Sequence, residues 1–533
     1  MDLERIAGAR FDALILGGGI TGVATAHRLA RLGWSPLLIE PRDLAWGTSS
    51  RSSRLIHGGL RYLAHGELRL VRRALAERRA LARIAPHLVR PTPMLLPLGR
   101  GEPWRWRTFA PAGVVAYDLL AGRRGWPRGR TIGRDEAETL VPGLRLGDER
   151  RVRVFYDGVT DDRRLTLVTA MAAREAGAQV VGRCELLGLE ATEHGARARL
   201  RDLVSGQTLD VVVRSVVNAT GPWVDRVRQR YGATRRGRLV RPSRGSHLAI
   251  PWRIDAAMLV PHPRDGRVGF FVPTATGMIV GTTDVADEGD PDAVRPSPDE
   301  IAYLEELADD GIPGMAGRER TGWAGLRPLA ESPGPTNALS RAARYVMESV
   351  EGIPFLSIVG GKLTLHRVMA RDAVRRLRPH LGTPARPARP DTAHLPGGDL
   401  ATLAGLEARL RATGLDATQA RWMVSRYGSQ AEAVLGDEPP APLGRGSIPL
   451  ACEVGWAVRE EGARTLSDVL LRWRLPELAL DAEDETRIAR AALTLLAHRL
   501  GLGSARAERE RARWERERRA VWGGTGDRAA ATR

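Results

Sequence analysis

The sequence predicts a mixed α/β (α+β) fold followed by a helical C-terminal region, and three observations support this prediction. An apolar run from Phe11 to Leu16 precedes a glycine-rich turn and a segment with helical spacing from Val23 to Leu32. Strand-like alternation, as in Val211 to Val217, recurs among Gly- and Pro-rich turns in the middle of the chain. Leu403 to Leu435 and Glu483 to Arg519 are mostly helical in pattern.

The length and composition describe two or three globular domains. The chain has 533 residues, of which 43% are hydrophobic and 27% charged, so it can bury a sizeable core and is not mainly disordered. Its two cysteines, Cys184 and Cys452, are too few and too far apart for a disulfide framework or a metal cluster. We therefore expect a reducing compartment and no metal.

The charge balance is unusual. Lys and Arg total 81 against 63 Asp and Glu, a formal net charge of +18, yet only one of these cations is a lysine, Lys362. A coding bias that replaces Lys by Arg would explain the kind of cation but not the excess over carboxylates. The excess indicates an anionic partner such as a membrane surface, a nucleic acid or a phosphorylated substrate.

The domain organisation follows from a Pro- and Gly-rich stretch in the last third of the chain. We predict a first region over 1–385, a linker over 386–398 and a helical domain over 399–533. The N-terminus lacks the apolar segment of a signal peptide, and no run of about 18 apolar residues occurs. We expect a cytoplasmic protein, peripheral on the inner face of the cell membrane and not spanning it.

A dinucleotide-binding pattern lies at the first turn. Gly17-Gly18-Gly19-Ile20-Thr21-Gly22 fits G-x-G-x-x-G, whose glycines allow a tight turn, close approach of the backbone to a pyrophosphate, and close helix packing. The pyrophosphate then lies at the positive end of the following helix. Glu40, 18 residues after Gly22, ends the second strand and is placed to accept from ribose hydroxyls, and its charge would repel a 2′-phosphate. The pattern predicts FAD or NAD rather than NADP.

The next block of sequence indicates FAD rather than NAD. Ser and Gly are dense between Gly47 and Leu63, and such a run offers hydroxyls and backbone N–H groups to phosphate and flavin ring edges, which a plain nicotinamide domain does not need. The alternative is a flexible serine linker, but the embedded apolar residues and the His-Gly-Gly turn argue against it. The candidate FAD contacts in this block are Thr48, Ser49, Ser50, Ser53, Leu55, His57, Gly58 and Gly59.

The same block resembles the signature of the FAD-dependent glycerol-3-phosphate dehydrogenases, members of the glycine/D-amino-acid oxidase fold group. The matching residues are Ser49-Ser50-x-Ser52-Ser53-Arg54-Leu55-Ile56-His57-Gly58-Gly59-Leu60-Arg61-Tyr62-Leu63. Further stretches are similar to family motifs and occur in the family's order, namely Val217–Asp225, Arg244–His247, Gly281–Asp284, Ala324–Leu329, Gly360–Thr364, Arg426–Gly428 and Thr465–Leu470. The resemblance implies a Rossmann-like FAD-binding domain, an interleaved antiparallel-sheet substrate domain and a C-terminal α-helical cap domain.

The resemblance also implies an activity. This is oxidation of sn-glycerol 3-phosphate to dihydroxyacetone phosphate, with hydride passing from C2 to N5 of FAD and electrons then going to a quinone. The alternative is an FAD-dependent oxidase or dehydrogenase of another small hydroxy or amino acid. Matching motif positions add Gly221, Gly361, Lys362, Leu363 and Thr364 to the candidate FAD contacts.

The substrate phosphate calls for guanidinium forks rather than point charges. Arg61 and Arg327 lie in matching motifs, whereas Arg344 is placed only by its spacing of 18 residues before Lys362, with Arg341 as its rival. We expect the three arginines Arg61, Arg327 and Arg344 to bind substrate together with Tyr62.

The segment around Lys362 is expected to face the reduced, anionic flavin. Phe355 to Val359 has the pattern of a strand, Gly360-Gly361 that of a turn, and a helix is expected to start at Lys362. This order would aim N–H groups and positive charge at the ring. A compact ammonium whose pKa can shift in a buried site offers chemistry that a guanidinium does not, so we expect Lys362 to be a catalytic group. Arg327, which lies in a matching motif, is expected to be catalytic as well.

Loss of the C2 hydroxyl proton requires a base with a pKa near neutral. His57 and His247 both lie in matching motifs, and we favour His247 because Gly58 and Gly59 indicate that His57 packs against the flavin. The family usually has a tyrosine two residues after Thr364, and this chain has His366 there. The substrate specificity therefore stays open.

Aromatic residues and cations are interleaved from Gly101 to Phe109, ahead of the apolar stretch Val114 to Leu120. This pattern suits the headgroup region of a membrane, and the alternative is an ordinary amphipathic core helix. We expect contact with an anionic membrane surface and with membrane quinone. No nucleic-acid partner is expected, because the cations are spread along the chain without a recognition module. The oligomeric state stays open, with a homodimer as one alternative.

Overall fold

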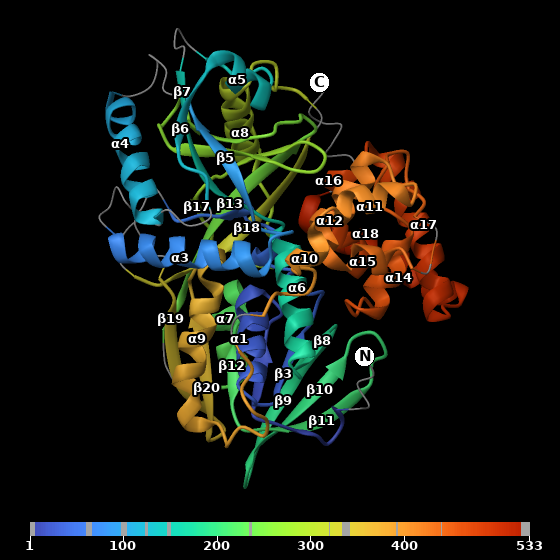
Figure 1. Cartoon of the computed structure of the whole chain (residues 1–533). Helices are drawn as coiled ribbons and strands as arrows, with labels where there is room; N and C mark the ends of the chain where they lie inside the picture. Colours follow the sequence, from blue (N-terminus) through green and yellow to red (C-terminus); the bar gives the residue numbers. More distant parts are fainter. Residues whose placement is uncertain are drawn as a thin grey trace.

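The computed structural model describes most of the chain. The described residues are 6–59, 67–97, 104–122, 126–146, 151–233, 237–318, 320–332, 342–390, 393–436, 438 and 440–523, with side chains excepted for 104–111. Figure 1 shows two stacked layers of sheet and helix, with a separate group of helices beside them.

A six-stranded sheet contains the opening βαβ unit. β2 (Ala13–Leu16) pairs in parallel with β3 (Pro36–Glu40), and α1 (Ile20–Arg31) connects them, as the sequence predicts. The strand order is β19-β20-β12-β2-β3-β8. The other strands are β8 (Gln179–Gly182), β12 (Val216–Asn218), β19 (Arg344–Val350) and β20 (Ile353–Val359), all parallel to their neighbours except β19 against β20.

The six-stranded sheet is covered on both faces, which explains the continuous apolar run in β2. Ala13 and Ile15 pack in one core with α1, α6 (Asp162–Glu175) and α9 (His366–Leu377). Leu14 and Leu16 point the other way, into a core shared with a four-stranded sheet. A strand buried on both faces has no polar side to alternate with its apolar one.

The four-stranded sheet corrects one prediction from the sequence. Its order is β1-β11-β10-β9, with β1 (Arg10–Phe11), β9 (Cys184–Thr192), β10 (Gly195–Asp202) and β11 (Thr208–Val213). The alternating run from Val211 to Val217 is not one strand. Its first half ends β11, and its second half begins β12 in the six-stranded sheet. Arg214 and Ser215 separate them, and the Ser215 hydroxyl donates to the carbonyl of Asp12 (2.8 Å).

A ten-stranded sheet forms the second layer. Its order is β17-β13-β16-β15-β14-β5-β7-β4, with β18 on β13 and β6 on β7. The strands are β4 (Leu55–Ile56), β5 (Arg90–Leu96), β6 (Arg130–Gly133), β7 (Arg151–Val159), β13 (Val240–Ile250), β14 (Ala257–Pro261), β15 (Val268–Pro273), β16 (Met278–Gly281), β17 (Val285–Ala286) and β18 (Thr321–Ala330). Most of its pairs are antiparallel, and its strands alternate along the chain with those of the six-stranded sheet, which confirms the expected interleaved arrangement.

Helices surround the second layer and link it to the first. Figure 1 shows α3 crossing between the two layers, with α4 and α8 beside the upper sheet and α7 beside the lower one. Their bounds are α3 (Leu68–Ile84), α4 (Trp104–Ala121), α5 (Arg134–Leu140), α7 (Val224–Arg230) and α8 (Pro298–Gly311).

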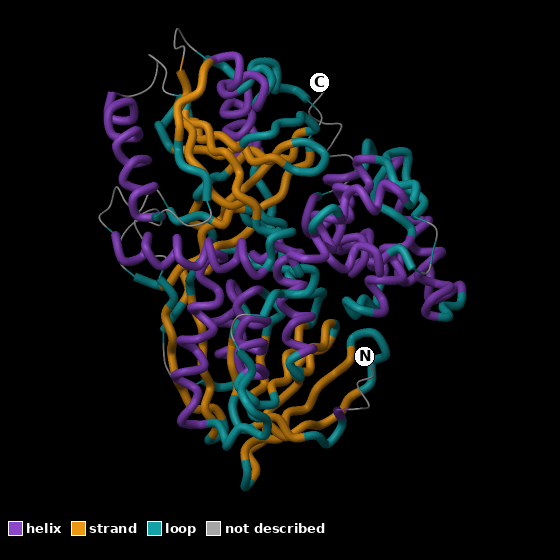
Figure 2. The backbone as a smooth tube through the Cα atoms, viewed as in Figure 1, coloured by secondary structure: helices purple, strands orange, loops and turns teal. Residues whose placement is uncertain are grey.

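The C-terminal region is helical, as predicted, and Figure 2 shows its helices grouped beside the strands of the two layers. The helices are α10 (Leu400–Leu403), α11 (Leu406–Ala412), α12 (Ala417–Tyr427), α13 (Ala431–Val434), α14 (Cys452–Arg459), α15 (Leu466–Trp473), α16 (Leu475–Leu478), α17 (Ala482–Leu500) and α18 (Ser504–Trp522). They share one core, which includes Trp422, Leu470 and Leu496.

The segment 386–398, predicted as a linker, lies against the first region where it is described. The Arg389 amide donates to the Arg31 carbonyl (2.7 Å), and the Leu395 amide donates to the Ile84 carbonyl (2.8 Å). Leu395 is buried in the core around α1 and α6. The described parts of this connection are therefore tied to the first region by backbone hydrogen bonds.

Candidate active site

A cavity of about 1830 Å³ lies between the two layers and collects most of the residues that the sequence singled out. Predicted residues in its wall are Gly17, Gly19, Thr21, Glu40, Thr48, Ser49, Ser53, Leu55, His57, Gly59, Gly221, His247, Arg327, Gly361, Lys362, Leu363 and Thr364. Gly18, Gly22, Ser50 and Gly58 are buried behind this wall. The chain thus brings segments that are more than 300 residues apart in sequence to one cavity.

The glycine-rich turn has the geometry that its spacing predicts. Gly17 has a φ of +106°, and a Cβ at this position would lie 2.8 Å from the carbonyl oxygen of Ala219. A Cβ on Gly22 would lie 2.0 Å from the Gly17 carbonyl oxygen. Only glycine fits at either place. As a result, α1 begins directly at the cavity, with its positive end toward it.

Glu40 and Ser49 fix the entrance to α1. The Glu40 carboxylate accepts from the amides of Gly18 (2.8 Å) and Arg42 (2.9 Å), and the Ser49 hydroxyl accepts from the amide of Ile20 (2.9 Å). Burial raises the pKa of Glu40, and the two amide bonds oppose this rise. The carboxylate lies in the cavity wall at the end of β3, where a ribose was expected.

Thr48 and Ser53 connect the Ser-rich block to β18 and β13. The Thr48 hydroxyl donates to the Leu326 carbonyl (2.5 Å), and the Ser53 hydroxyl shares a hydrogen bond with Nε2 of His247 (2.9 Å). Ser50 instead faces the protein interior, where its hydroxyl accepts from Arg163 (2.9 Å). Ser50 is therefore a structural member of the block and lies away from the cavity surface.

A buried network supports the turn at His57 and Gly58. The Gly58 amide donates to the Tyr117 hydroxyl (2.7 Å), and this hydroxyl contacts both carboxylate oxygens of Asp157 (2.9 and 2.8 Å). Arg78 pairs with the same carboxylate. The sequence did not single out Tyr117, Asp157 or Arg78, because they come from three separate elements and match no local motif.

The segment after β20 also matches its prediction. Gly360 and Gly361 have φ of +74° and +96°, and the short 3-10 turn Leu363–Leu365 leads into α9. Lys362 precedes this turn and lies in the cavity wall. The Thr364 hydroxyl accepts from the His57 amide (3.2 Å), which joins this segment to the His-Gly-Gly turn. His366 is buried, and its Nδ1 contacts the Leu363 carbonyl (2.7 Å).

His247 does not have the near-neutral pKa that the sequence led us to expect. Its ring is 2% exposed and stacks on Trp323 with centroids 5.5 Å apart. Burial is the main cause that lowers the pKa of His247 to about 3, followed by the charges of Arg327 and Arg54. The ring is therefore neutral at physiological pH, and its Nδ1 is buried without a hydrogen-bond partner among the described residues.

The predicted substrate arginines differ in their placement. Arg327 lies in the cavity wall, where its guanidinium donates to Thr282 (2.8 Å), Thr283 (3.1 Å) and Ser243 (3.3 Å). It therefore also fixes β18 against the segment after β16. Arg344 is exposed on the edge strand β19, where it donates to the Glu331 carbonyl (3.4 Å). Its expected place in the site is wrong, because spacing along the chain did not reveal which side of β19 it occupies. Arg61, Tyr62 and Arg341 lie outside the described residues.

Arg51 is a cavity residue that the sequence analysis passed over. It is 7% exposed, and its guanidinium lies 5.5 Å from the Trp46 ring centroid. Its Nε is buried without a hydrogen-bond partner, and none of the ion pairs between described residues includes it. Burial, then the charges of Arg163 and Arg42, lower the pKa of Arg51 to about 9, and the charge of Asp292 opposes this lowering. Arg51 is protonated at neutral pH and forms no direct ion pair among the described residues, so its buried guanidinium favours an anion in the cavity.

Helix α4 forms part of the cavity rim. Its residues Ala112, Gly113 and Ala116 line the cavity, whereas Val115 is 48% and Leu119 77% exposed. The Trp- and Arg-containing turns at its start have no described side chains. Within the described ranges, none of the helices is both long enough and apolar enough to cross a bilayer.

The fold and the cavity define a flavin-dependent oxidoreductase, and comparison with known proteins agrees. Residues 12–367 match the family model described as FAD dependent oxidoreductase. Residues 389–507 match the model described as the C-terminal domain of alpha-glycerophosphate oxidase.

Individual relatives identify the family within these oxidoreductases. A protein of Mycobacterium leprae named glycerol-3-phosphate dehydrogenase is 35% identical over 88% of this chain and 81% of its own length. D-erythritol 1-phosphate dehydrogenase of Brucella abortus is 33% identical over 86% of this chain and 93% of its own. The solved glycerol-3-phosphate dehydrogenase of Bacillus halodurans, complexed with FAD, has the same fold, with a TM-score of 0.73, 23% identity and coverage of 97% and 96%. The chain belongs to the FAD-dependent glycerol-3-phosphate dehydrogenase family.

The residues in the cavity fit FAD as the resident cofactor. A glycine turn at a helix N-terminus suits a pyrophosphate. The buried cation of Arg51, which forms no direct ion pair among the described residues, adds an observation that does not depend on the fingerprint.

Proposed function

We propose that the protein oxidises sn-glycerol 3-phosphate to dihydroxyacetone phosphate and passes the electrons to a membrane quinone. The observation that carries this proposal is the convergence of the glycine turn, the Ser-rich block and the Gly360-Gly361-Lys362 turn on one cavity. FAD, when bound, accepts the hydride that leaves C2 of the substrate. The protein's own groups bind the two ligands, orient them and take up the hydroxyl proton.

The candidate site residues have separate roles in this proposal. Gly17, Gly19, Thr21 and Arg51 would hold the pyrophosphate, and Glu40 the ribose. Lys362 would place positive charge where negative charge develops as hydride arrives. Arg327, with Arg61 and Tyr62 from the segment outside the described residues, would hold the substrate phosphate.

Proton removal is assigned to one of the two histidines. Burial of the His247 ring, and then the charges of the arginines around it, lower the pKa of His247 and so oppose uptake of a proton. His57 is half-buried in the same wall, next to the flavin segment at Thr364. We therefore favour His57 over His247 as the proton acceptor, and we assign His247 to fixing Ser53.

Anaerobic titration with glycerol 3-phosphate tests the proposal. The purified protein should show the absorbance of oxidised flavin, and substrate should bleach it stoichiometrically. The same titration with erythritol 1-phosphate, glycerol and a panel of amino acids serves as control, because one relative is named for erythritol 1-phosphate. Bleaching by amino acids but not by glycerol 3-phosphate would contradict the proposal. In air, abundant hydrogen peroxide without turnover of a quinone analogue would indicate an oxidase instead.

The quinone requires contact with a membrane, which we assign to helix α4. Its exposed Val115 and Leu119 lie one turn apart, next to the cavity-lining Ala112 and Ala116 on the helix surface, and the chain has a net charge of +18. The protein should pellet with anionic vesicles at low salt and be released at high salt. Val115→Ser/Leu119→Ser should weaken pelleting without changing flavin content, and indifference of the parent protein to vesicles would contradict the assignment. This proposal places the protein peripherally on the inner membrane face, and a homodimer remains a prediction from the sequence.

A further inference from the structure

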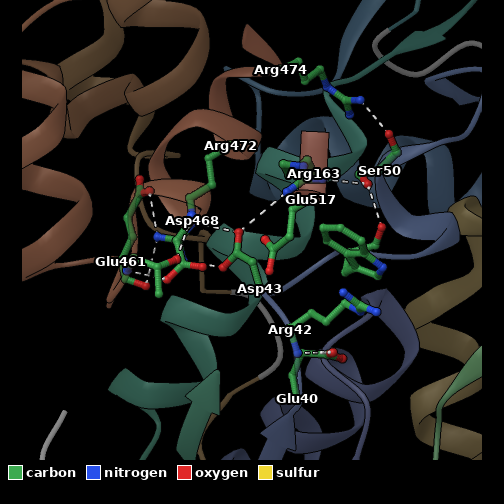
Figure 3. A network of polar contacts seen from close by, with 12 residues as sticks. Glu40, Arg42, Asp43, Ser50, Arg163, Glu461, Asp468, Arg472, Arg474 and Glu517 are labelled. Atoms are coloured by element: carbon green, nitrogen blue, oxygen red, sulfur yellow. Dashed lines mark hydrogen bonds and ion pairs between the residues drawn. The ribbon is translucent and has the colours of Figure 1, made fainter. Parts of the chain in front are cut away.

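The loop of residues 43–53, here called the serine loop, is held by the C-terminal helical domain. It leaves β3 and forms one wall of the cavity through Trp46 to Ser49 and Arg51 to Ser53. At its start, the Asp43 carboxylate accepts from Arg472 of α15 (2.6 and 3.2 Å). In its middle, the Ser50 carbonyl accepts from Arg474 (2.5 Å). Both contacts are visible in Figure 3.

Arg474 also reaches the loop through a second residue. It pairs with Asp162 at the start of α6, and Asp162 accepts from the amide (3.1 Å) and the hydroxyl (2.7 Å) of Ser52. The next residue, Ser53, contacts His247 in the cavity wall. A continuous series of polar contacts therefore runs from the helical domain to the cavity.

The end of the loop has a contact of the same kind. Arg54, directly after the loop, pairs with Glu477 of α16. Between the two ends, Arg163 of α6 donates to the Ser50 hydroxyl (2.9 Å) and lies 3.6 Å from Asp43 (Figure 3). The side chains of Arg472, Arg474 and Glu477 are 3%, 6% and 6% exposed. Breaking a buried pair leaves an uncompensated charge, so these contacts strongly favour one loop conformation.

We propose that the C-terminal helical domain is a working part of the flavin site, in which Arg474 positions the serine loop for the phosphates of FAD. Arg472 and Glu477 hold the two ends of the loop, and Arg474 fixes its middle through Ser50 and through Asp162 to Ser52. The proposal rests on FAD as the cofactor and does not depend on the identity of the substrate.

The test compares two arginines at the same domain junction. Arg464 pairs with Asp202 (2.6 and 2.9 Å) between the helical domain and the four-stranded sheet, and among the described residues its side chain bonds to Asp202 and Gly182 but not to the serine loop. Arg474→Met and Arg464→Met therefore both remove an interdomain ion pair, but only the first releases the loop. The full-length proteins are stripped of FAD, and the dissociation constant of FAD is measured by flavin fluorescence, together with Tm.

The expected result is a dissociation constant for FAD that rises about tenfold or more in Arg474→Met and less than about threefold in Arg464→Met. Arg474→Lys should fall between the parent and Arg474→Met, because one ammonium cannot hold Ser50 and Asp162 with the same fork. If Arg474→Met does not fold, Arg474→Lys and Arg464→Lys give the same comparison. Equal dissociation constants in the matched pair would overturn the proposal. Tight FAD binding without bleaching by glycerol 3-phosphate would contradict the proposed function and leave this inference intact.

Discussion

Replacing Lys362 by arginine should lower kcat by about 100-fold, although the charge is kept. Lys362 lies in the cavity wall directly after two glycines with positive φ, and its carbonyl accepts from the Leu365 amide (2.9 Å). The position therefore has little freedom to shift for a longer side chain. Groups aimed at developing negative charge are each worth about 3 kcal/mol in the transition state, and a displaced, planar guanidinium loses most of that.

The measurement is kcat with an artificial electron acceptor, together with flavin content from the absorbance spectrum. The matched control is the reverse exchange, Arg375→Lys, on the exposed side of the helix that follows, where the side chain is 69% exposed. This control should keep full activity, since a solvated cation of either kind serves there. Near-normal kcat in Lys362→Arg would contradict the assigned role and would indicate that the single lysine was retained by chance.

The parts of the site that sequence predicted are those whose geometry is local. The turn from Gly17 to Gly22 needs glycine because of contacts with Ala219 and within the turn itself. The strand before Lys362 and the helix after it follow from apolar pattern and two glycines. Such features depend on backbone conformation over a few residues, and a motif records that conformation directly.

The parts that sequence could not predict depend on contacts between distant segments. The run from Val211 to Val217 divides between two sheets, because its two halves pair with different neighbours. Arg344 lies on the exposed side of an edge strand, and a spacing of residues says nothing about that orientation. The pKa of His247 is lowered first by burial and then by arginines from three segments, and a motif in the sequence shows neither of these causes.

Arg51 provides a further prediction. Its charge should destabilise the folded protein without FAD and stabilise the protein with FAD bound. The residue occupies the variable position of the Ser49-Ser50-x-Ser52-Ser53 block, which is why the motif gave it no role. Its guanidinium is buried near Arg163 and Arg42, which lower its pKa, and the charge of Asp292 opposes this lowering without forming a direct ion pair among the described residues. In the absence of FAD this arrangement destabilises the folded protein, and the pyrophosphate removes the penalty when it binds.

Arg51→Met should therefore weaken FAD binding and stabilise the protein without FAD. The dissociation constant of FAD should rise about 100-fold, because a buried charge-assisted hydrogen bond contributes about 1.5–3 kcal/mol and each 1.4 kcal/mol is about tenfold. The Tm of the FAD-free protein should rise, since methionine fills a similar space without a charge. Arg226→Met is the control. Arg226 is 51% exposed, pairs with Asp290 (2.8 Å) and is not among the residues that line the cavity, so its loss should change FAD affinity less than about threefold. A fall in Tm of the FAD-free Arg51→Met protein, or unchanged FAD affinity, would mean that Arg51 finds its anion within the protein and not in the cofactor.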